Sequence, residues 1–377
     1  MINYLPPLSL YIHIPWCLKK CDYCDFNVHK YQKKIDQNNY IKHVILDLRN
    51  NLPLILNRNI KTVFIGGGSP GLIKIEIIKK LIKKIKEILK IKNKIEITIE
   101  INPNKKEIYK INQFVKAGIN RISIGIQTFN KKNMVLIGRN QELKNIMRSV
   151  KIVKSTNCKN FNIDIIYGLP NQTIEEAIYD IKKAIKLKPD HISWYQLTVE
   201  KNTILYYKKP ILPNENVLYK ITKLGNKILK NNGFYQYEIS SYAKKNKKCK
   251  HNLNYWRFGD YLGIGCGAHS KITQSNNKIL RIIKNKRPID FIKGKYINKK
   301  YEILKKDKII EYFMNYFRIY EKVSIKKFSK YTNIKEQDIL PKIQKAIKHG
   351  YITKNKNNLN TTKKGKLFLN DLLEIFI

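Results

Sequence analysis

Three cysteines lie within eight residues near the start of the chain, at Cys17, Cys21 and Cys24. A loop with the spacing C-x3-C-x2-C can wrap an iron–sulfur cluster, but it supplies only three thiolates for four irons. One iron of a [4Fe-4S] cluster is then left without a cysteine, and an open metal position allows a substrate or cofactor to bind. The spacing therefore predicts a reactive cluster rather than a purely structural metal site.

The wider stretch LYIHIPWCLKKCDYCDF, residues 10–26, resembles the signature of the radical S-adenosylmethionine (SAM) enzymes. More narrowly, it is similar to their coproporphyrinogen-oxidase-like branch, in which an aromatic-x-His-Ile-Pro-aromatic run leads into the first cysteine. The resemblance implies a [4Fe-4S] cluster whose open iron is chelated by the amino and carboxylate groups of SAM. It also implies that reduction of the cluster cleaves SAM to methionine and a 5′-deoxyadenosyl radical.

Zinc is the alternative occupant of this loop, because Cys-x2-Cys pairs often hold zinc. A zinc ion bound by the three cysteines needs a fourth ligand, and the nearby candidates are Asp22, Asp25 and His29. The cysteine spacing, joined to its flanking motif, favours the cluster over zinc.

Apolar segments of strand length alternate with amphipathic helical segments from residue 8 to about residue 197. The expected strands are residues 8–14, 62–65, 95–101, 121–125, 160–166 and 191–197. Residues 73–89 are typical of the expected helices, with isoleucines and leucines on one face and lysines on the rest. Six such units indicate an α/β fold with a parallel sheet. The resemblance implies a partial, TIM-like (β/α)6 radical SAM barrel.

Reactive groups in parallel βα folds gather where strands end and loops begin. The second expected strand ends in Gly-Gly-Gly-Ser-Pro, residues 66–70, and glycines let a backbone approach a ligand closely. Polar side chains follow later strands; carboxylates suit an ammonium or ribose hydroxyl, and arginine suits a carboxylate. Each alone is equally an ordinary turn, surface or helix-capping residue. The SAM contacts that the resemblance implies are Tyr11, Gly67, Gly68, Ser69, Glu100, Gln127, Arg139 and Asp164.

The segment HNLNYWRFGDYLGIGCGAHS, residues 251–270, is rich in histidine, aromatic residues and glycine. Its aromatic side chains can pack beside a flat ligand, and His251 can serve as an axial ligand of haem iron. A hydrogen-bonded His251 in an ordinary aromatic core is the alternative. A zinc site is a further alternative, although its spacing fits no familiar pattern. The aromatic residues are Tyr255, Trp256, Phe258 and Tyr261, and the zinc set would be Cys249, His251, Cys266 and His269.

The last part of the chain, from about residue 300, is helical and then contains two short expected strands around a polar turn. This pattern indicates a winged-helix-like module, and such modules often bind DNA. The resemblance implies instead a helical domain that covers the barrel mouth as a lid. We therefore expect a barrel in residues 1–200, a barrel extension with the haem-associated segment in 201–300, and a C-terminal α+β domain in 301–377.

The chain is very basic, with 75 Lys and Arg against 28 Asp and Glu and a net charge of +47. Lysines are spread along every segment together with many Ile and Asn, which is typical of coding by an AT-rich genome. A binding site for a polyanion needs a clustered patch of positive charge, so the spread of lysines does not favour one. The sequence contains no run of about 18 apolar residues, so we expect no membrane-spanning helix. No export signal is visible at the N-terminus. We expect a cytoplasmic protein, which suits an open thiolate-bound cluster.

Two groups within the branch are separated by one position. The coproporphyrinogen III oxidases carry a further cysteine two residues after the third cluster cysteine, where this chain has Phe26. The motif HNLNYW, residues 251–256, is characteristic of the haem-chaperone group. The resemblance therefore implies a haem chaperone that passes haem to an unidentified acceptor protein, with an electron donor if SAM is cleaved. The basic amphipathic helix at residues 73–89 allows a transient contact with a membrane surface, although the outer layer of a barrel is the favoured place for it. The alternatives are oxidative decarboxylation of coproporphyrinogen III and, from charge alone, a nucleic-acid-binding module.

Overall fold

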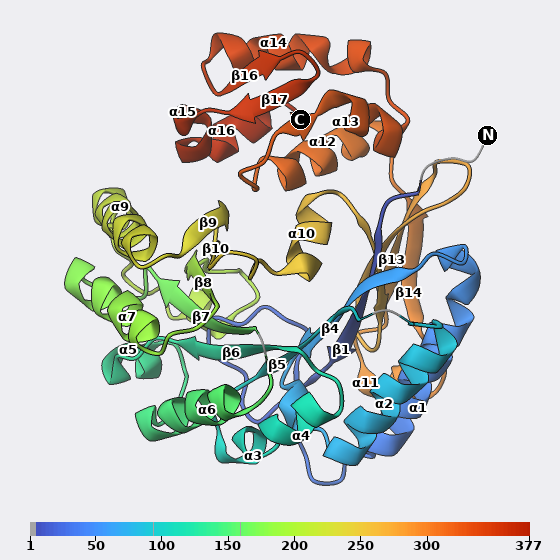
Figure 1. The fold of residues 1–377 in the computed structure, drawn as a ribbon, viewed down its shortest axis with the longest axis vertical. Coiled ribbons are helices and arrows are strands. Elements are labelled where there is room, and N and C mark those ends of the chain that lie inside the picture. Colours follow the sequence, from blue (N-terminus) through green and yellow to red (C-terminus); the bar gives the residue numbers. More distant parts are fainter. Residues whose placement is uncertain (1–4, 93, 159) are drawn as a thin grey trace.

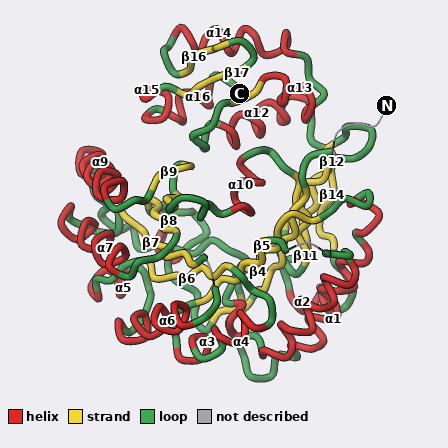
Figure 2. The backbone as a smooth tube through the Cα atoms, in the orientation of Figure 1, coloured by secondary structure: helices red, strands yellow, loops and turns green. Residues whose placement is uncertain are grey.

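The computed structural model describes residues 5–92, 94–158 and 160–377. Within these residues, twelve strands form one sheet in the order β14-β13-β12-β11-β1-β4-β5-β6-β7-β8-β10-β9. Figure 1 shows this sheet as an open arch with helices on its outer side, and Figure 2 shows the strands following the arch. The parallel part consists of β11 (Asp260–Ile264), β1 (Leu8–Ile14), β4 (Ile60–Gly67), β5 (Glu96–Ile101), β6 (Arg121–Gln127), β7 (Phe161–Tyr167) and β8 (His191–Gln196).

All six strands expected in the first half are present, and the α/β architecture with a parallel sheet is confirmed. The bounds of β1 agree with the prediction, and the other five differ by at most two residues at either end. The strand β11 was not expected, and it extends the parallel sheet on the far side of β1. Antiparallel strands then continue both edges: β12 (His269–Thr273), β13 (Ile279–Lys284) and β14 (Ile297–Glu302) beside β11, and β10 (Ser241–Ala243) and β9 (Tyr235–Glu238) beside β8.

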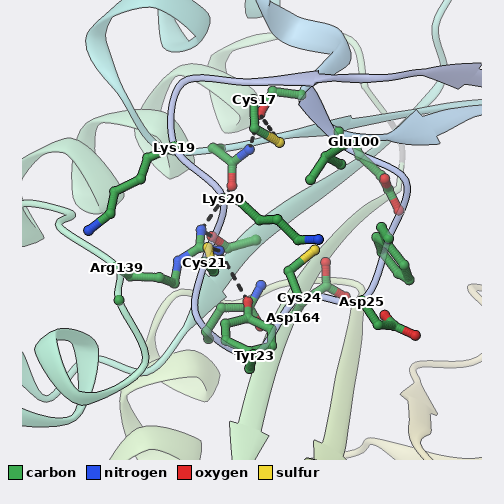
Figure 3. A pocket seen from close by; sticks show the side chains of 18 of the residues that line it. Cys17, Lys19, Lys20, Cys21, Tyr23, Cys24, Asp25, Glu100, Arg139 and Asp164 are labelled. Carbon is green, nitrogen blue, oxygen red and sulfur yellow. Dashed lines mark hydrogen bonds between the residues drawn. The ribbon is translucent and has the colours of Figure 1, made fainter. Parts of the chain in front are cut away.

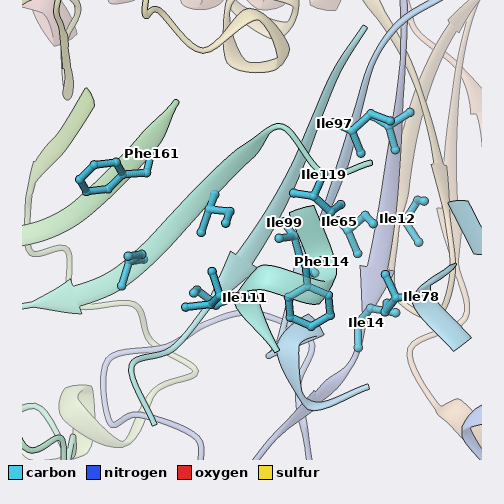
Figure 4. Close-up of a cluster of buried hydrophobic side chains, with 14 of the residues drawn as sticks. Ile12, Ile14, Ile65, Ile78, Ile97, Ile99, Ile111, Phe114, Ile119 and Phe161 are labelled. Carbon is cyan, nitrogen blue, oxygen red and sulfur yellow. The ribbon is translucent and has the colours of Figure 1, made fainter. Parts of the chain in front are cut away.

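The outer helices pack on alternate residues of the strands. Along β1, Leu8, Leu10, Ile12 and Ile14 are fully buried in the main core. Figure 4 shows Ile12 and Ile14 beside Ile78 of α2 (Ile75–Ile88), the helix expected at residues 73–89. Since successive strand residues point to opposite faces, Tyr11 and His13 lie on the inner face of the arch.

The remaining outer helices follow the same rule, with one apolar face on the sheet. In α7 (Ile174–Lys186), Thr173 and Glu176 form a capping box that satisfies the first amide groups of the helix. The other helices of this layer are α1 (Gln37–Asn50), α3 (Lys105–Ile108), α4 (Ile111–Lys116), α5 (Lys131–Leu136), α6 (Leu143–Ser155), α9 (Glu215–Asn231) and α11 (Pro288–Ile292). The short helix α8 (Ile204–Tyr207) contacts the loop that carries Asp22.

The strand β11 is fixed at its first residue by a buried carboxylate. Asp260 is fully buried and accepts hydrogen bonds from Arg58 at 2.7 Å and Lys271 at 2.9 Å. The backbone amide and hydroxyl of Thr273 also donate to it, at 2.7 and 2.9 Å. These bonds tie β11 to β12 and to the loop before β4, so the added strands form one body with the barrel.

The C-terminal domain has a three-stranded sheet in the order β15-β17-β16, and its buried core is continuous with Tyr237, Leu253 and Phe258 of the preceding segment. The two strands expected around a polar turn are present as β16 (Ile352–Asn355) and β17 (Asn358–Thr361). The other elements are α12 (Lys305–Tyr316), β15 (Val323–Ser324), α13 (Ile325–Thr332), α14 (Leu340–Lys348), α15 (Lys363–Leu367) and α16 (Leu369–Glu374).

The position of this domain corrects the expectation of a lid over the barrel mouth. Figure 1 shows the domain beyond α10 (Lys250–Trp256). Its contacts with the barrel include an ion pair between Glu321 and Arg257 and a bridge between Ile319 and Glu238 of β9. The helix α10 in turn meets the starts of β4 and β5, because Thr62 and Glu96 bind it. Among the described residues of the domain, none lines a cavity at the carboxyl ends of the strands, where the cluster loop lies.

No helix in the described part of the chain is long and apolar enough to cross a membrane.

Candidate cluster and cofactor site

The loop that carries the three cysteines is held in place by hydrogen bonds of the Asp22 backbone. The amide of Asp22 donates to the carbonyl of Ile137 at 3.1 Å, and its carbonyl accepts from the amide of Leu205 at 2.8 Å. Its buried carboxylate pairs with Lys208 at 2.6 Å. Asp22 therefore anchors the loop to two distant segments, and it is not among the residues that line the cavity beside the cysteines.

The three thiols face one cavity of about 540 Å³ at the carboxyl ends of the strands. Figure 3 shows Cys17, Cys21 and Cys24 around this space, with Arg139 beside Cys21. The Ser69 hydroxyl lies 3.7 Å from Cys17 Sγ, and Arg139 Nη1 lies 3.5 Å from Cys21 Sγ. Hydrogen-bond donors at the ligand sulfurs are what an iron–sulfur cluster uses to adjust its charge and potential.

Burial raises the pKa of the Cys17 thiol to about 12, and it also raises the pKa of Cys24. Both side chains are therefore thiols at neutral pH before metal arrives. Binding to iron must then displace their protons, so we expect loading of the site to release protons.

The arrangement fits a cluster better than a zinc ion. Ligands of one zinc ion converge to within 2.0–2.3 Å of a single point, whereas the cysteines of a cluster bind separate irons. Among the described residues, no group of three or more His, Cys, Asp and Glu side chains converges in a way that could hold a single ion. Of the suggested fourth zinc ligands, Asp22 is paired with Lys208, and His29 Nε2 is bonded to the Lys286 carbonyl at 2.9 Å.

The glycine turn after β4 packs against the cluster loop. Gly67 has φ +105°, and a Cβ there would lie 2.5 Å from the His13 ring. A Cβ at Gly68 would lie 2.5 Å from the Trp16 carbonyl oxygen, and its amide donates to the Ile14 carbonyl at 2.7 Å. Both positions thus require glycine, because a side chain would push the turn away from the loop. Both residues also line the cavity, so the turn serves the loop and the ligand space together.

Two carboxyl groups form the far wall of the cavity. Glu100 Oε2 accepts from the Gly67 amide at 3.1 Å, and Asp164 accepts from Ser123 at 2.9 Å and Asn162 at 2.7 Å. Burial, and then the negative charge of Asp164, raise the pKa of Glu100 to about 8. The wall therefore holds one proton that an incoming cation or hydroxyl donor can replace.

Arg139 connects the cluster loop to the ends of β5 and β6. Its Nη2 donates to the Gly125 carbonyl at 2.7 Å and to Asn102 Oδ1 at 2.8 Å, while Nη1 donates to Tyr23 and to the Cys21 sulfur. Asn102 in turn donates to the Ser69 hydroxyl at 2.7 Å, so one chain of polar contacts runs from Cys21 to Cys17.

The cavity brings together ten of the residues predicted from the sequence: Cys17, Cys21, Cys24, Gly67, Gly68, Ser69, Glu100, Gln127, Arg139 and Asp164. Tyr11 and His251 are not among its lining residues. Tyr11 lines a neighbouring cavity, with its hydroxyl 3.0 Å from His13 Nδ1.

His251 belongs to α10 and is buried more deeply than the residues that line the two cavities. It is 1% exposed, its Nδ1 is 2.7 Å from the Thr62 hydroxyl and its Nε2 is 3.1 Å from the Tyr255 hydroxyl. Burial lowers its pKa to about 3, so the ring is neutral. This is the hydrogen-bonded core histidine that stood as the alternative to a haem ligand, and neither ring nitrogen is open to iron in this arrangement.

Sequence reasoning missed two residues of the site. Asn102 follows the end of β5, a position that the strand-end rule could have singled out. Tyr195 lies within β8, and its hydroxyl donates to Gln127 Oε1 at 3.0 Å, which orients the Gln127 side chain at the cavity. No pattern in the sequence pairs Tyr195 with a residue 68 positions earlier.

The arch and the three-cysteine cavity define a radical SAM protein. The model of the Radical SAM superfamily matches residues 11–184, and that of the HemN C-terminal domain matches residues 303–368. A [4Fe-4S] cluster and SAM are the cofactors that this membership brings. The solved structure of coproporphyrinogen III oxidase (HemN) from Escherichia coli is similar in fold, with a TM-score of 0.83 and 22% identity, and the match covers 99% of this chain and 90% of that chain.

Curated relatives show to which family of radical SAM proteins the chain belongs. Heme chaperone HemW of Buchnera aphidicola subsp. Schizaphis graminum is 52% identical over 373 residues, which cover 99% of each chain. Heme chaperone HemW of Escherichia coli strain K12 is 43% identical, again over 99% of each chain. The protein of the same name from Bacillus subtilis strain 168 is 31% identical over 98% of this chain and 99% of its own. The chain belongs to the HemW family.

Proposed function

We propose that this protein is a haem chaperone, which binds haem and passes it to an acceptor protein. The observation that carries the proposal is the 52% identity to a heme chaperone HemW over 99% of both chains. The residue two positions after the third cluster cysteine also supports the proposal. Phe26 stands where the resemblance places a further cysteine in the oxidases, and a phenyl ring can neither bind metal nor exchange a proton.

In this proposal, Cys17, Cys21 and Cys24 hold the [4Fe-4S] cluster. When bound, the reduced cluster would supply the electron for one-electron reduction of SAM. The residues around them position and protect these cofactors. Arg139 and Ser69 donate toward ligand sulfurs.

The remaining predicted contacts belong to the SAM side of the cavity. Glu100 and Asp164 offer carboxylate oxygens to the ammonium group or a ribose hydroxyl. The glycine turn brings backbone close to the ligand, and Gln127 is held in place by Tyr195. Tyr11, the remaining predicted SAM contact, would reach the cofactor from the neighbouring cavity.

The partners and location that we propose follow from the same cofactors. The protein needs an acceptor for haem, an electron donor if SAM is cleaved, and a transient contact with a membrane surface if its acceptor lies there. Its lysines are spread along the whole chain, so we propose no specific nucleic-acid partner. A reducing cytoplasm suits a thiolate-bound cluster with an open iron.

The test uses full-length protein reconstituted with iron and sulfide under anaerobic conditions. Haem is titrated into one half of the sample, and coproporphyrinogen III, SAM and a reductant are added to the other half. The proposal predicts one equivalent of bound haem and no decarboxylated porphyrinogen. Formation of protoporphyrinogen at enzymatic rates would overturn the chaperone assignment and restore the oxidase.

A further inference from the structure

A second cavity, of about 550 Å³, lies beside the first on the inner face of the arch. Its walls come from β1, the cluster loop, α10, and the segment from β11 to the loop after β13. The cavity volume is within the range of small-molecule sites. Four residues of the cluster loop line both cavities: Lys20, Asp25, Phe26 and Val28. The second cavity therefore borders the same cysteine loop as the first.

Two of the described histidines line this cavity, His13 and His269. His13 is bonded through both ring nitrogens, to Tyr11 at 3.0 Å and to the Asn27 carbonyl at 2.9 Å. His251 is likewise bonded at both nitrogens, and it does not line the cavity. His269, at the start of β12, is exposed and lines the cavity, and its ring has no hydrogen-bond partner among the residues that the structure describes. A neutral imidazole with an open nitrogen is a common ligand of haem iron.

The rest of the cavity suits a flat apolar ring with acidic side chains. Tyr255 and Tyr261 form an aromatic wall, with ring centroids 4.4 Å apart in an edge-on contact. Phe26 adds an apolar surface that is 57% exposed. Aromatic faces of this kind pack well on a planar macrocycle. Lys20 and Lys286 also line the cavity and provide cations for carboxylates.

We propose that haem occupies this second cavity, with His269 as the protein ligand of its iron. The inference rests on the proposed function, because it names the place where a haem chaperone would hold its cargo. It replaces His251, the ligand expected from the sequence, and assigns His251 a positioning role. By bonding to the Tyr255 hydroxyl, His251 holds one ring of the aromatic wall.

The test is a haem titration of the full-length, cluster-loaded protein and two histidine variants. In His269→Ala, we expect the absorption spectrum of bound haem to lose its imidazole signature and the affinity to fall at least tenfold. In His269→Met, a thioether replaces the imidazole, so the spectrum should change again rather than return to that of the native protein. The matched control is His349→Ala, at an exposed histidine after α14 that lines neither cavity, and it should keep the spectrum and stay within about threefold of the native affinity. Iron and sulfide content verifies that each variant is folded and loaded.

The outcomes separate this inference from the proposed function. Binding of one haem by the native protein, with loss of the spectrum in His269→Ala and retention in His349→Ala, supports both. An unchanged spectrum and affinity in His269→Ala overturns the assignment of the ligand and leaves the chaperone function standing. If the native protein takes up no haem, the proposed function fails, and the inference fails with it.

Discussion

Arg139 Nη1 lies 3.5 Å from Cys21 Sγ, although 117 residues separate the two side chains in the sequence. The same guanidinium donates to the carbonyl of Gly125 at the end of β6. A cation on a ligand sulfur offsets the negative charge of a thiolate-bound cluster. The contact also holds the loop against the sheet, so one residue serves both the charge and the position of the cysteines.

Replacing any one of Cys17, Cys21 and Cys24 by Ala should abolish the cluster, because two thiolates do not hold four irons at ordinary affinity. Iron and acid-labile sulfide, measured after anaerobic reconstitution, give the result. Cys158→Ala is the matched control, since Cys158 lies half-buried with its sulfur near the Asn160 carbonyl, away from the cavity. Full iron and sulfide in Cys21→Ala, or stoichiometric zinc in the native protein, would contradict the assignment.

Arg139→Lys should weaken SAM binding about tenfold and lower the free energy of unfolding by about 1–3 kcal/mol. Lysine keeps the charge but cannot donate to Gly125, Asn102 and Tyr23 together, and it leaves buried acceptors unbonded. Equilibrium dialysis with SAM and urea denaturation measure the two effects. Arg148→Lys, at an exposed arginine over the Tyr109 ring, should change neither. A native-like SAM affinity in Arg139→Lys would remove Arg139 from the site.

Asp260→Asn should lower the free energy of unfolding by about 3–5 kcal/mol. The change leaves the buried Lys271 without its anion and takes from Arg58 a charged partner, and an unpaired buried cation is costly. Glu302→Gln is the control, because its pair with Lys278 is 41–53% exposed and should contribute about 0–1 kcal/mol. Equal effects of the two changes would show that Asp260 does not anchor β11.

Acid should destabilise the fold through His251. Its pKa is lowered from 6.5 to about 3 by burial and then by the positive charge of Arg121. Between pH 6.5 and 3 the unfolded chain therefore binds a proton that the folded chain does not. Stability falls as the pH falls through this window, by up to about 1.4 kcal/mol per pH unit for this group.

The check compares native protein and His251→Gln, both without cluster, by urea denaturation at several pH values. The variant should be the less stable of the two at pH 8, because it loses the bonds to Thr62 and Tyr255. Its disadvantage should shrink as the pH falls below 6.5, since glutamine takes up no proton. A constant difference across the range would mean that His251 is not the titrating group.

The sequence predicted those parts of the site whose residues are adjacent in the chain or stand at the end of a single strand. Strand β1 and the cysteine loop are adjacent in the chain, and each later strand carries its polar residue at its own carboxyl end. These residues therefore reach one cavity once the strands lie parallel. The spacing and strand-end rules are sufficient for Cys17, Ser69, Glu100 and Asp164.

The parts that were missed depend on pairing between distant segments. Strand β11 has five residues, contains a glycine and pairs with β1, whose partner residues lie about 250 positions earlier. No local pattern gives that register. The same pairing turns α10 beneath the barrel, which buries His251 instead of presenting it to a ligand. His269 reaches the second cavity for the same reason, because β12 follows β11 back along the arch.

Lys20, Asp25, Phe26 and Val28 form a wall that the two cavities share, so ligands in the two cavities would contact the same loop. Whatever fills one cavity restricts the loop that also bounds the other, and such coupling acts equally in both directions. Loss of the cluster would therefore alter a wall of the second cavity as well as the first.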